Sequence, residues 1–553
     1  METYGNVKAT PFSYWLSDSM RKTFDSKKTF EECGNPRAGI TTGDNDSFLR
    51  LWFEVENGNV EFSGDSVETF HKTGKKYIPY NKGGEKVKWY GNRDYVIMFD
   101  KKHYDILSNQ GNHLPSRQYY MRECITWSDI SGRSFAARYC PKGSVFDVKG
   151  SCGFPNDKDF WFSIALLNCN LTPLYIDSLN PTTTTQVGDL KRIPILPMNE
   201  QIKNEVELLA RECVRLAKED WDLDETSWDF SRNTLIRTGI DSVEEAYRLY
   251  EEECQNRYDT LINNEYSLNQ LFIDAYGLTE EVSPSVNLSE VKLRKANRHD
   301  AIVSLISYAV GCMLGRYSLD IDGIAYAGGE RNQNIYSSIV PDIDGIIPIT
   351  DTDYFNDDIV SKFVEFVKVV YGESNLEKNL AFIADSLGIR GTSSREILRN
   401  YFINSFYKDH CNIYSVMGSG KRPIYWMFDS GKENGFKCLI YMHRYNKDTL
   451  NLIRSEYLHK TEDAVENALK NAEYIIQTSA SAVERAKATK DRDRYVKQLN
   501  EMRIYYQALS HLALQKIEID LDDGVKHNYQ LFQGVEVIAD GGKKQKVDLL
   551  AKI

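Results

Sequence analysis

The hydrophobic periodicity of the chain changes after Pro194 and Pro197. Beyond these prolines, apolar residues recur every three or four positions and would line one face of a helix. This run comprises Ile202, Val206, Leu209, Cys213 and Leu216. Before the prolines, turn-forming and aromatic residues surround short apolar runs at 48–55 and 95–99, which is typical of strands. We therefore expect a mixed or mostly β region followed by a helical one.

A chain of 553 residues is too long for one compact core, so we expect several domains and a multi-domain α+β fold. The pattern predicts four segments: a mixed α/β domain at 1–198, a helical spacer at 199–299, a mixed α/β region at 300–458, and a helical hairpin with a C-terminal tail at 459–553.

Several elements within these segments can be predicted individually. Ser242 and Glu245 form a capping-box pattern that opens a second spacer helix, and a third helical stretch ends near Gly277. Further expected elements are a buried helix at 301–312, a β-hairpin formed by 424–428 and 436–441, and two long helices around 464–475 and 496–509 joined by the charged segment 484–494.

Charge is distributed unevenly along the chain. The net charge is −12, yet residues 1–198 hold 25 Lys and Arg against 23 Asp and Glu, which leaves 43 against 57 for the rest. The segment 71–149 holds 15 Lys and Arg, 7 Asp and Glu, and many aromatic residues. A basic, aromatic-rich segment in an acidic chain suits contact with phosphates, and a set of solvated lysine-rich loops is the alternative.

Other features narrow the class of protein. No stretch approaches the roughly 20 apolar residues of a membrane span, and the N-terminus lacks the regions of a secretory signal. The ten cysteines include no C-x-x-C pair, so we expect reduced, mostly buried thiols. The expected location is the cytoplasm.

The sequence lacks the catalytic motifs of several classes of enzyme, including methyltransferases, NTPases and metalloproteases. Adenine methylation requires a glycine-rich loop for S-adenosylmethionine and an Asn-Pro-Pro-Tyr-like segment that grips the flipped base. Neither Asn35-Pro36 nor Asn180-Pro181 continues in this way, and Gly328-Gly329 lacks the expected strand-loop-helix context. Neither an NTPase phosphate-binding loop nor His-Glu-x-x-His is present. We expect no cofactor and no metal in this chain.

Several motifs occur in order along nearly the whole chain: Pro11–Leu16, Gly39–Arg50, Trp52–Val55, Lys88–Tyr90, Ile125–Ser128, Ser134–Arg138, Leu179–Thr182, Val187–Leu190, Ile193–Ile195, Ala309–Asp320, Lys421–Phe428, Tyr441–Tyr445 and Asp520–Lys526. Together they resemble the target-recognition and C-terminal parts of PglX-type adenine-specific DNA methyltransferases. These enzymes belong to bacterial phage-exclusion (BREX) systems and are related to single-chain restriction-modification enzymes.

The resemblance implies a DNA target-recognition domain at 1–198, within a protein whose methyltransferase module binds S-adenosylmethionine. Met1 begins directly at the recognition region, so we expect the catalytic module to lie outside this chain, and the chain alone to be inactive. The implied partners are double-stranded DNA, the protein's own N-terminal methyltransferase domain, other proteins of the defence system, and phage anti-restriction proteins that mimic DNA.

Candidates for DNA contact come from loops of the basic domain, because Arg and Lys read guanine, Asn and Gln read adenine, and Lys, Arg, Ser and Thr contact phosphates. They are Thr42, Asn45, Arg50, Lys101, Lys102, His103, Arg117, Gln118, Arg133, Ser134, Arg138 and Lys142. The pair Arg117 and Gln118, and the group Arg133, Ser134 and Arg138, come first, since aromatic residues lie nearby.

Structural explanations compete with these roles. Asp44 and Asn45 suit a turn closed by their own side chains, and 101–103 suits a solvated loop. Trp52, Trp89 and Trp127 are expected as core anchors. The helical half offers a second candidate DNA contact, formed by Lys421, Arg422, His443 and Arg444. The nearby aromatic residues Tyr425, Trp426 and Phe428 are expected in the core. Arg316 suits a structural ion pair.

Two other classes of function stay open. A nuclease would need a cluster of metal-binding carboxylates, but Asp351 with Asp353, and Asp520 with Asp522 and Asp523, are more typical of turns and caps. An acidic protein-interaction scaffold without DNA binding of its own would show no salt-dependent affinity for DNA.

Overall fold

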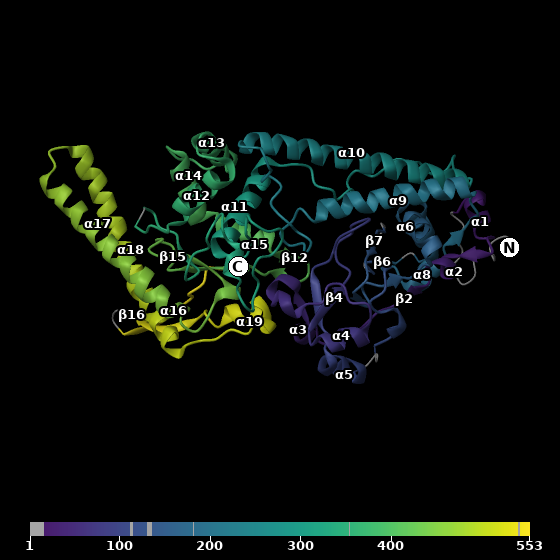
Figure 1. Cartoon of the computed structure of the whole chain (residues 1–553), viewed down its shortest axis with the longest axis horizontal. Helices are drawn as coiled ribbons and strands as arrows, with labels where there is room; N and C mark the ends of the chain where they lie inside the picture. The colour runs from purple at the N-terminus through teal and green to yellow at the C-terminus, as the bar shows by residue number, and fades with distance from the viewer. Residues whose placement is uncertain (1–15, 111–113, 130–134, 181, 353, 540–541) are drawn as a thin grey trace. The chain divides into compact units, whose positions relative to one another are not determined.

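The computed structural model describes residues 16–110, 114–129, 135–180, 182–352, 354–539 and 542–553. The chain has an α+β fold with two compact units (Figure 1). Unit 1 consists of Met1–Trp52, Gly58–Asp229 and Glu251–Ala296, and unit 2 of Phe53–Asn57, Phe230–Tyr250 and Asn297–Ile553. The predicted multi-domain α+β class is confirmed.

Unit 2 surrounds a small antiparallel sheet with helices. Its helices are α11 (Arg298–Leu314), α12 (Ile359–Tyr371), α13 (Leu376–Ser386), α14 (Ser394–Asn404), α15 (Phe406–Ile413), α16 (Thr449–Leu452), α17 (His459–Thr478), α18 (Ala482–Gln515) and α19 (Gly524–Gln530). Its strands are β11 (Ile346–Pro348), β12 (Ser415–Val416), β13 (Gly420–Lys421), β14 (Tyr425–Asp429), β15 (Lys437–Tyr441), β16 (Val535–Ala539) and β17 (Lys543–Val547).

The predicted β-hairpin and buried helix of unit 2 are both present. Strands β14 and β15 pair antiparallel from Tyr425 opposite Tyr441 to Asp429 opposite Lys437. Tyr425, Trp426 and Phe428 are fully buried, as expected for core residues. Helix α11 is buried along most of its length. Its C-cap is Gly315, whose positive φ of 85° suits glycine.

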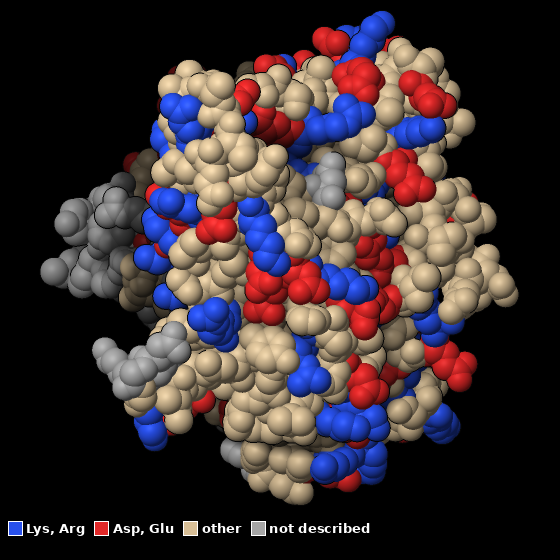
Figure 2. Space-filling view, turned by 90° about the vertical axis from the view of Figure 1, so that its left-hand side faces the viewer, with Lys and Arg blue, Asp and Glu red and all other residues tan. Residues whose placement is uncertain are grey.

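The helical hairpin of α17 and α18 projects from the rest of unit 2 (Figure 1). The predicted connection was wrong, because the charged segment 484–494 lies inside α18. Ser481 begins this helix by accepting a hydrogen bond from the Glu484 amide. Charges of opposite sign within the segment stabilise the helix, as in the Arg494–Asp491 pair at 3.4 Å, instead of breaking it. Figure 2 views the molecule from the side of α17 and α18 and shows Lys and Arg intermixed with Asp and Glu.

Unit 1 contains two four-stranded sheets, ordered β2-β9-β6-β7 and β3-β5-β4-β8, and the pair β1-β10. The strands are β1 (Lys28–Thr29), β2 (Pro36–Arg37), β3 (Leu49–Leu51), β4 (Tyr77–Asn81), β5 (Tyr95–Met98), β6 (Cys124–Trp127), β7 (Ala137–Cys140), β8 (Val145–Phe146), β9 (Cys152–Gly153) and β10 (Pro194–Ile195). The helices are α1 (Asp18–Thr23), α2 (Phe30–Gly34), α3 (Asn45–Phe48), α4 (Val67–Thr73), α5 (Lys101–Asn109), α6 (Phe160–Asn168), α7 (Leu171–Leu179), α8 (Val187–Lys191), α9 (Glu200–Trp221) and most of α10 (Val243–Ala275).

Two predicted elements of this part of the chain differ in extent. The expected strand at 48–55 is limited to β3, because Phe48 ends helix α3 and Trp52–Glu54 form a 3-10 turn. The second and third helical stretches are one helix, α10, of 33 residues. Its start is as predicted, since the Glu245 amide donates to Ser242 Oγ, and Gly277 lies just past its end with a φ of 66°.

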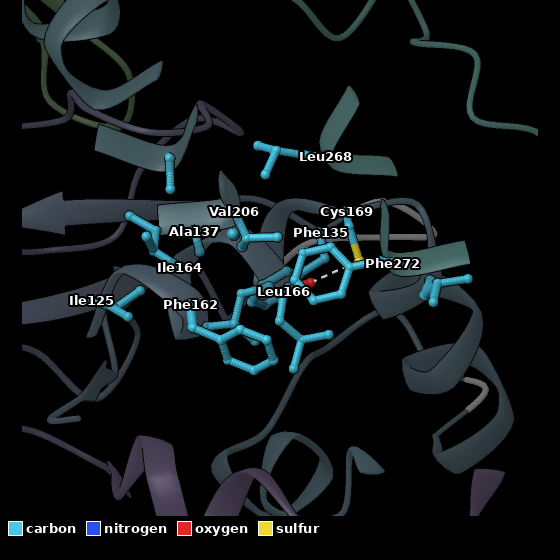
Figure 3. Close-up of a cluster of buried hydrophobic side chains, with 14 of the residues drawn as sticks. Ile125, Phe135, Ala137, Phe162, Ile164, Leu166, Cys169, Val206, Leu268 and Phe272 are labelled. Atoms are coloured by element: carbon cyan, nitrogen blue, oxygen red, sulfur yellow. Dashed lines mark hydrogen bonds between the residues drawn. The ribbon is translucent and has the colours of Figure 1, made fainter. Parts of the chain in front are cut away.

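The core of unit 1 joins its sheets to the helices that follow Pro197. Figure 3 shows Ile125 and Ala137 from β6 and β7 beside Ile164 of α6, Val206 of α9 and Phe272 of α10. These residues belong to one cluster of buried side chains. Helices α9 and α10 therefore position the sheets through apolar packing, which contributes about 25 cal/mol per Å² of buried apolar surface. Nine of the ten cysteines are buried and all ten are free thiols, as predicted.

Candidate nucleic-acid interface

The exposed candidates of unit 1 lie on four neighbouring segments: the loop before α3, the first turn of α5, the loop Leu114–Arg122, and the turn Pro141–Gly143. Helix α3 contacts α5 through Phe48, which packs edge-on against His103 at 6.2 Å. The loop Leu114–Arg122, called the arginine loop below, contacts α5 through Arg117, whose guanidinium lies 5.6 Å from the centre of the Tyr104 ring. Two backbone hydrogen bonds, from Met121 to Ser144 and from Gly143 to Met121, tie this loop to the turn.

The loop before α3 is organised by side-chain hydrogen bonds. Asp44 caps α3 by accepting from the Ser47 amide at 3.2 Å, so its predicted turn-closing role is confirmed. Thr42 is buried and donates to Asn45 Oδ1 at 2.6 Å, and Lys82 donates to the same oxygen at 2.9 Å. Both bonds use the carbonyl oxygen of Asn45, so its exposed amide nitrogen remains a donor for a ligand. Arg50 is half-buried and donates to the Asp46 and Leu49 carbonyls, which makes it a support for α3.

The cluster Lys101, Lys102 and His103 begins a helix, not a loop. Asp100 caps α5 and also contacts the His103 ring, which is half-buried. Both lysines are exposed at the helix start, and Lys101 forms an ion pair with Asp105 one turn later. Lys102 therefore presents the freest positive charge of the three.

The arginine loop has an unusual backbone. Leu114, Ser116 and Met121 have φ values of 52°, 61° and 65°, in the left-handed region that non-glycine residues rarely adopt. Such conformations cost on the order of 1–3 kcal/mol each and persist only where surrounding contacts impose them. The Tyr120 hydroxyl donates to the Pro115 carbonyl at 2.7 Å, which supplies one of these contacts. The loop holds Arg117, Gln118 and Arg122 exposed to solvent.

One strong sequence candidate is buried. Arg138 in β7 is 1% exposed and donates to the Glu85 carbonyl and to Ser128 Oγ, each at 3.3 Å. Burial lowers the pKa of its guanidinium to about 10. Direct contact between Arg138 and DNA is therefore incompatible with this conformation, because its side chain is buried. Lys142 is exposed, whereas Arg133 and Ser134 lie outside the described residues.

Three of the four basic residues proposed in unit 2 bind other residues of that unit, and the fourth, Lys421, is half-buried. His443 is buried and its Nε2 donates to the Val55 carbonyl at 3.1 Å. Arg444 donates to the Leu314 and Ile343 carbonyls, and Arg422 lies 3.6 Å from Glu54. Arg316, fully buried, donates to the hydroxyls of Tyr317 and Tyr441. A DNA contact by this second set is not supported.

Arg37 and Arg122, which no sequence pattern singled out, both lie beside Tyr119. Their guanidinium carbons are 5.3 Å and 5.6 Å from the centre of its ring. Arg37 occupies β2, whereas Tyr119 and Arg122 belong to the arginine loop. No local sequence pattern links residues so far apart in the chain.

Within the described ranges, the candidate metal and cofactor residues do not form a binding site. In the part of the chain that the structure describes, no three His, Cys, Asp or Glu side chains gather closely enough to hold a metal ion. Asp520 caps a short 3-10 helix, as predicted. Gly328 and Gly329 lie in an irregular segment against Glu56, not between a strand and a helix, and so they do not fit a nucleotide-binding loop. Among the described helices, none is long and apolar enough to cross a membrane.

Comparisons with known proteins identify relatives for nearly the entire chain, although no protein-family model matches it. It is 37% identical over 545 residues, 95% of its length, to the adenine-specific methyltransferase PglX of Lacticaseibacillus casei (strain Zhang). It is 36% identical over 563 residues, 96% of its length, to the adenine-specific methyltransferase BrxX of Escherichia coli O9:H4 (strain HS). The chain is related to adenine-specific methyltransferases. It spans 44% and 45% of the lengths of these two relatives. The predicted PglX-type resemblance is confirmed at this level.

Proposed function

We propose that this chain recognises DNA for an adenine-specific methyltransferase of a BREX-type defence system, and that unit 1 selects the target site. The observation that carries the proposal is the gathering of exposed basic and amide side chains on four adjoining segments of unit 1, in a chain related to PglX and BrxX. The backbone conformation of the arginine loop supports it, because strained loops held by their surroundings cluster at functional sites.

The roles proposed for the individual side chains follow from the way adenine is methylated. The base must leave the helical stack before its amino group can be methylated, so the duplex has to be held on both sides of the target. Lys101, Lys102 and Lys142 would contact phosphates, while Asn45, Arg117 and Gln118 would read base edges. The transfer of the methyl group from S-adenosylmethionine would belong to a part of the full-length protein outside this chain.

The same basic surface indicates which partners this chain would bind. Host DNA in the cytoplasm would be the substrate, and the protein's own methyltransferase domain and other defence proteins would assemble around it. A phage protein with DNA-like negative charges would compete for the basic residues, because it presents the same electrostatic pattern.

The test is the affinity of the chain for duplex DNA, measured by fluorescence anisotropy across a series of salt concentrations. Lys102 and Lys142 suit substitution, since both are exposed and neither forms an ion pair with a described residue. The variant Lys102→Ala/Lys142→Ala is expected to reduce the slope of log affinity against log salt by about 1.8, at about 0.9 for each phosphate contact.

The matched control is Lys470→Ala/Lys487→Ala, which removes two exposed charges from unit 2, neither of them in an ion pair with a described residue. It is expected to retain the wild-type slope. Selection of bound duplexes from a random pool then identifies the site. Absence of binding by the wild-type chain at low salt would refute the proposal, and equal effects of the two variants would show that the surface is not in unit 1.

A further inference from the structure

Tyr119 has a hydroxyl whose accepting capacity is already used. Asn35 Nδ2 donates to the phenolic oxygen at 2.9 Å, and Arg37 Nη2 donates to it at 3.4 Å. These donors hold the pKa of Tyr119 below its ordinary value, with the hydrogen bond from Asn35 the larger cause. A phenol oxygen that accepts two hydrogen bonds directs its own hydrogen elsewhere. No described residue accepts that hydrogen, so the site offers an O–H donor to a ligand.

Two positive charges lie beside this donor without a carboxylate partner. Among the described residues, no Asp or Glu lies within ion-pair distance of Arg37 or Arg122, although Glu123 is adjacent in sequence. Glu123 instead accepts a hydrogen bond from Tyr139 at 2.6 Å. Arg122 is exposed and Arg37 is half-buried. The accepting capacity of the Tyr119 hydroxyl is used, and a guanidinium can only donate. These groups around one ring are therefore best satisfied by an anion.

The site is also held in position before any ligand arrives. Arg37 belongs to strand β2, where it pairs with Cys152 of β9. The arginine loop is joined to the end of this strand by the hydrogen bond from Ser116 Oγ to the Ala38 carbonyl at 3.1 Å. The Tyr119 ring packs against Phe154 with 4.6 Å between ring centres. A fixed arrangement of donors binds an anion more tightly, because less conformational freedom is lost on binding.

We propose that Arg37, Tyr119 and Arg122 form a binding site for one phosphodiester of the DNA backbone, and that this contact fixes where the arginine loop lies along the duplex. The inference rests on the proposed DNA recognition by unit 1. It assigns these three residues to positioning, since phosphate contacts carry no direct sequence information. The neighbouring side chains Arg117 and Gln118 would then face the base edges.

The experiment compares wild type, Arg37→Gln/Arg122→Gln and Tyr119→Phe for binding to duplexes of preferred and random sequence, across the same salt series. The double variant is expected to lose about tenfold or more in affinity at low salt on both duplexes, because charge-assisted hydrogen bonds are lost. Its salt slope should fall by about 0.9, the value for one phosphate. Tyr119→Phe should weaken binding less, with the slope unchanged. Thermal unfolding measured on each variant controls for folding.

Methylphosphonate substitution of the DNA gives the decisive readout. One neutral linkage is expected to weaken the wild type and to have no further effect on the double variant. If wild type binds DNA but the double variant keeps the affinity and slope, or loses affinity only on the preferred sequence, the phosphate site is wrong while DNA recognition stands. If wild type does not bind DNA, the proposed function itself fails.

Discussion

Two buried histidines of unit 2 should make its stability fall in mild acid. His410 is 1% exposed and His443 is 6% exposed. The Tyr425 amide donates to His410 Nε2 at 3.0 Å, while His443 Nε2 donates to the Val55 carbonyl. Desolvation, followed by the charge of the nearby Arg316, lowers the pKa of each imidazole to about 3. Both histidines are therefore neutral in the folded protein at pH 7.

The size of the effect follows from linkage between protonation and folding. The pKa of an unfolded histidine is about 6.5, so between pH 6.5 and pH 3 the unfolded chain binds a proton that the folded chain does not. Stability is fully present above pH 6.5 and falls by about 1.4 kcal/mol per pH unit for each histidine below it. At pH 4.5 the two together should lower the free energy of unfolding by about 5 kcal/mol, a large part of the 5–15 kcal/mol typical of a domain.

This change in unit 2 can be measured by urea unfolding at pH 7.0 and 4.5, with hydrogen exchange of peptides from β14 and β15 as the readout. His443→Gln keeps a side-chain donor for the Val55 carbonyl but cannot titrate, so it should remove about half of the pH dependence. His299→Gln, at a histidine whose side chain is 46% exposed, serves as the control. Parallel pH profiles for wild type and His443→Gln would refute the argument that the buried imidazole resists protonation.

Further predictions concern unit 1. Glu265 is 4% exposed and accepts hydrogen bonds from Trp89 Nε1 at 2.6 Å and from Lys88 Nζ at 3.1 Å. In urea unfolding, Glu265→Ala should therefore destabilise unit 1 by about 3–5 kcal/mol, and Glu265→Gln should destabilise it by less. Equal losses of stability in the two variants would contradict a role for the negative charge. Desolvation raises the pKa of Asp94 to about 7, so the folded state binds this proton more tightly than the unfolded state does. The stability of unit 1 should therefore fall as the pH rises from 4 to 7. Asp94→Asn should lack this decline and should be more stable than wild type at pH 8. Arg138→Met should lower the melting temperature yet leave the salt slope for DNA unchanged below it, and a reduced slope would restore Arg138 as a DNA contact.

Local patterns predicted the elements that depend on neighbouring residues. The spacing of Val206, Cys213 and Leu216 predicts the buried face of α9, because residues three, four and seven apart lie on the same side of a helix. Ser242 marks the start of α10, because a capping side chain accepts a hydrogen bond from an amide only three residues along the chain. The extent of elements was less predictable, as α10 and the charged first half of α18 show, because tertiary packing decides whether a polar stretch continues a helix.

The sequence by itself determined the α+β class, the change to helices after Pro197, the buried tryptophans and thiols, and the resemblance to PglX-type methyltransferases, all of which depend on composition, periodicity and short motifs. Only the tertiary structure decided which basic side chains are available to a ligand. It buries Arg138 within a strand and brings Arg37 beside Tyr119, 82 residues away in the chain. Exposure and convergence of charges depend on contacts between distant segments, and these are absent from any local pattern of residues.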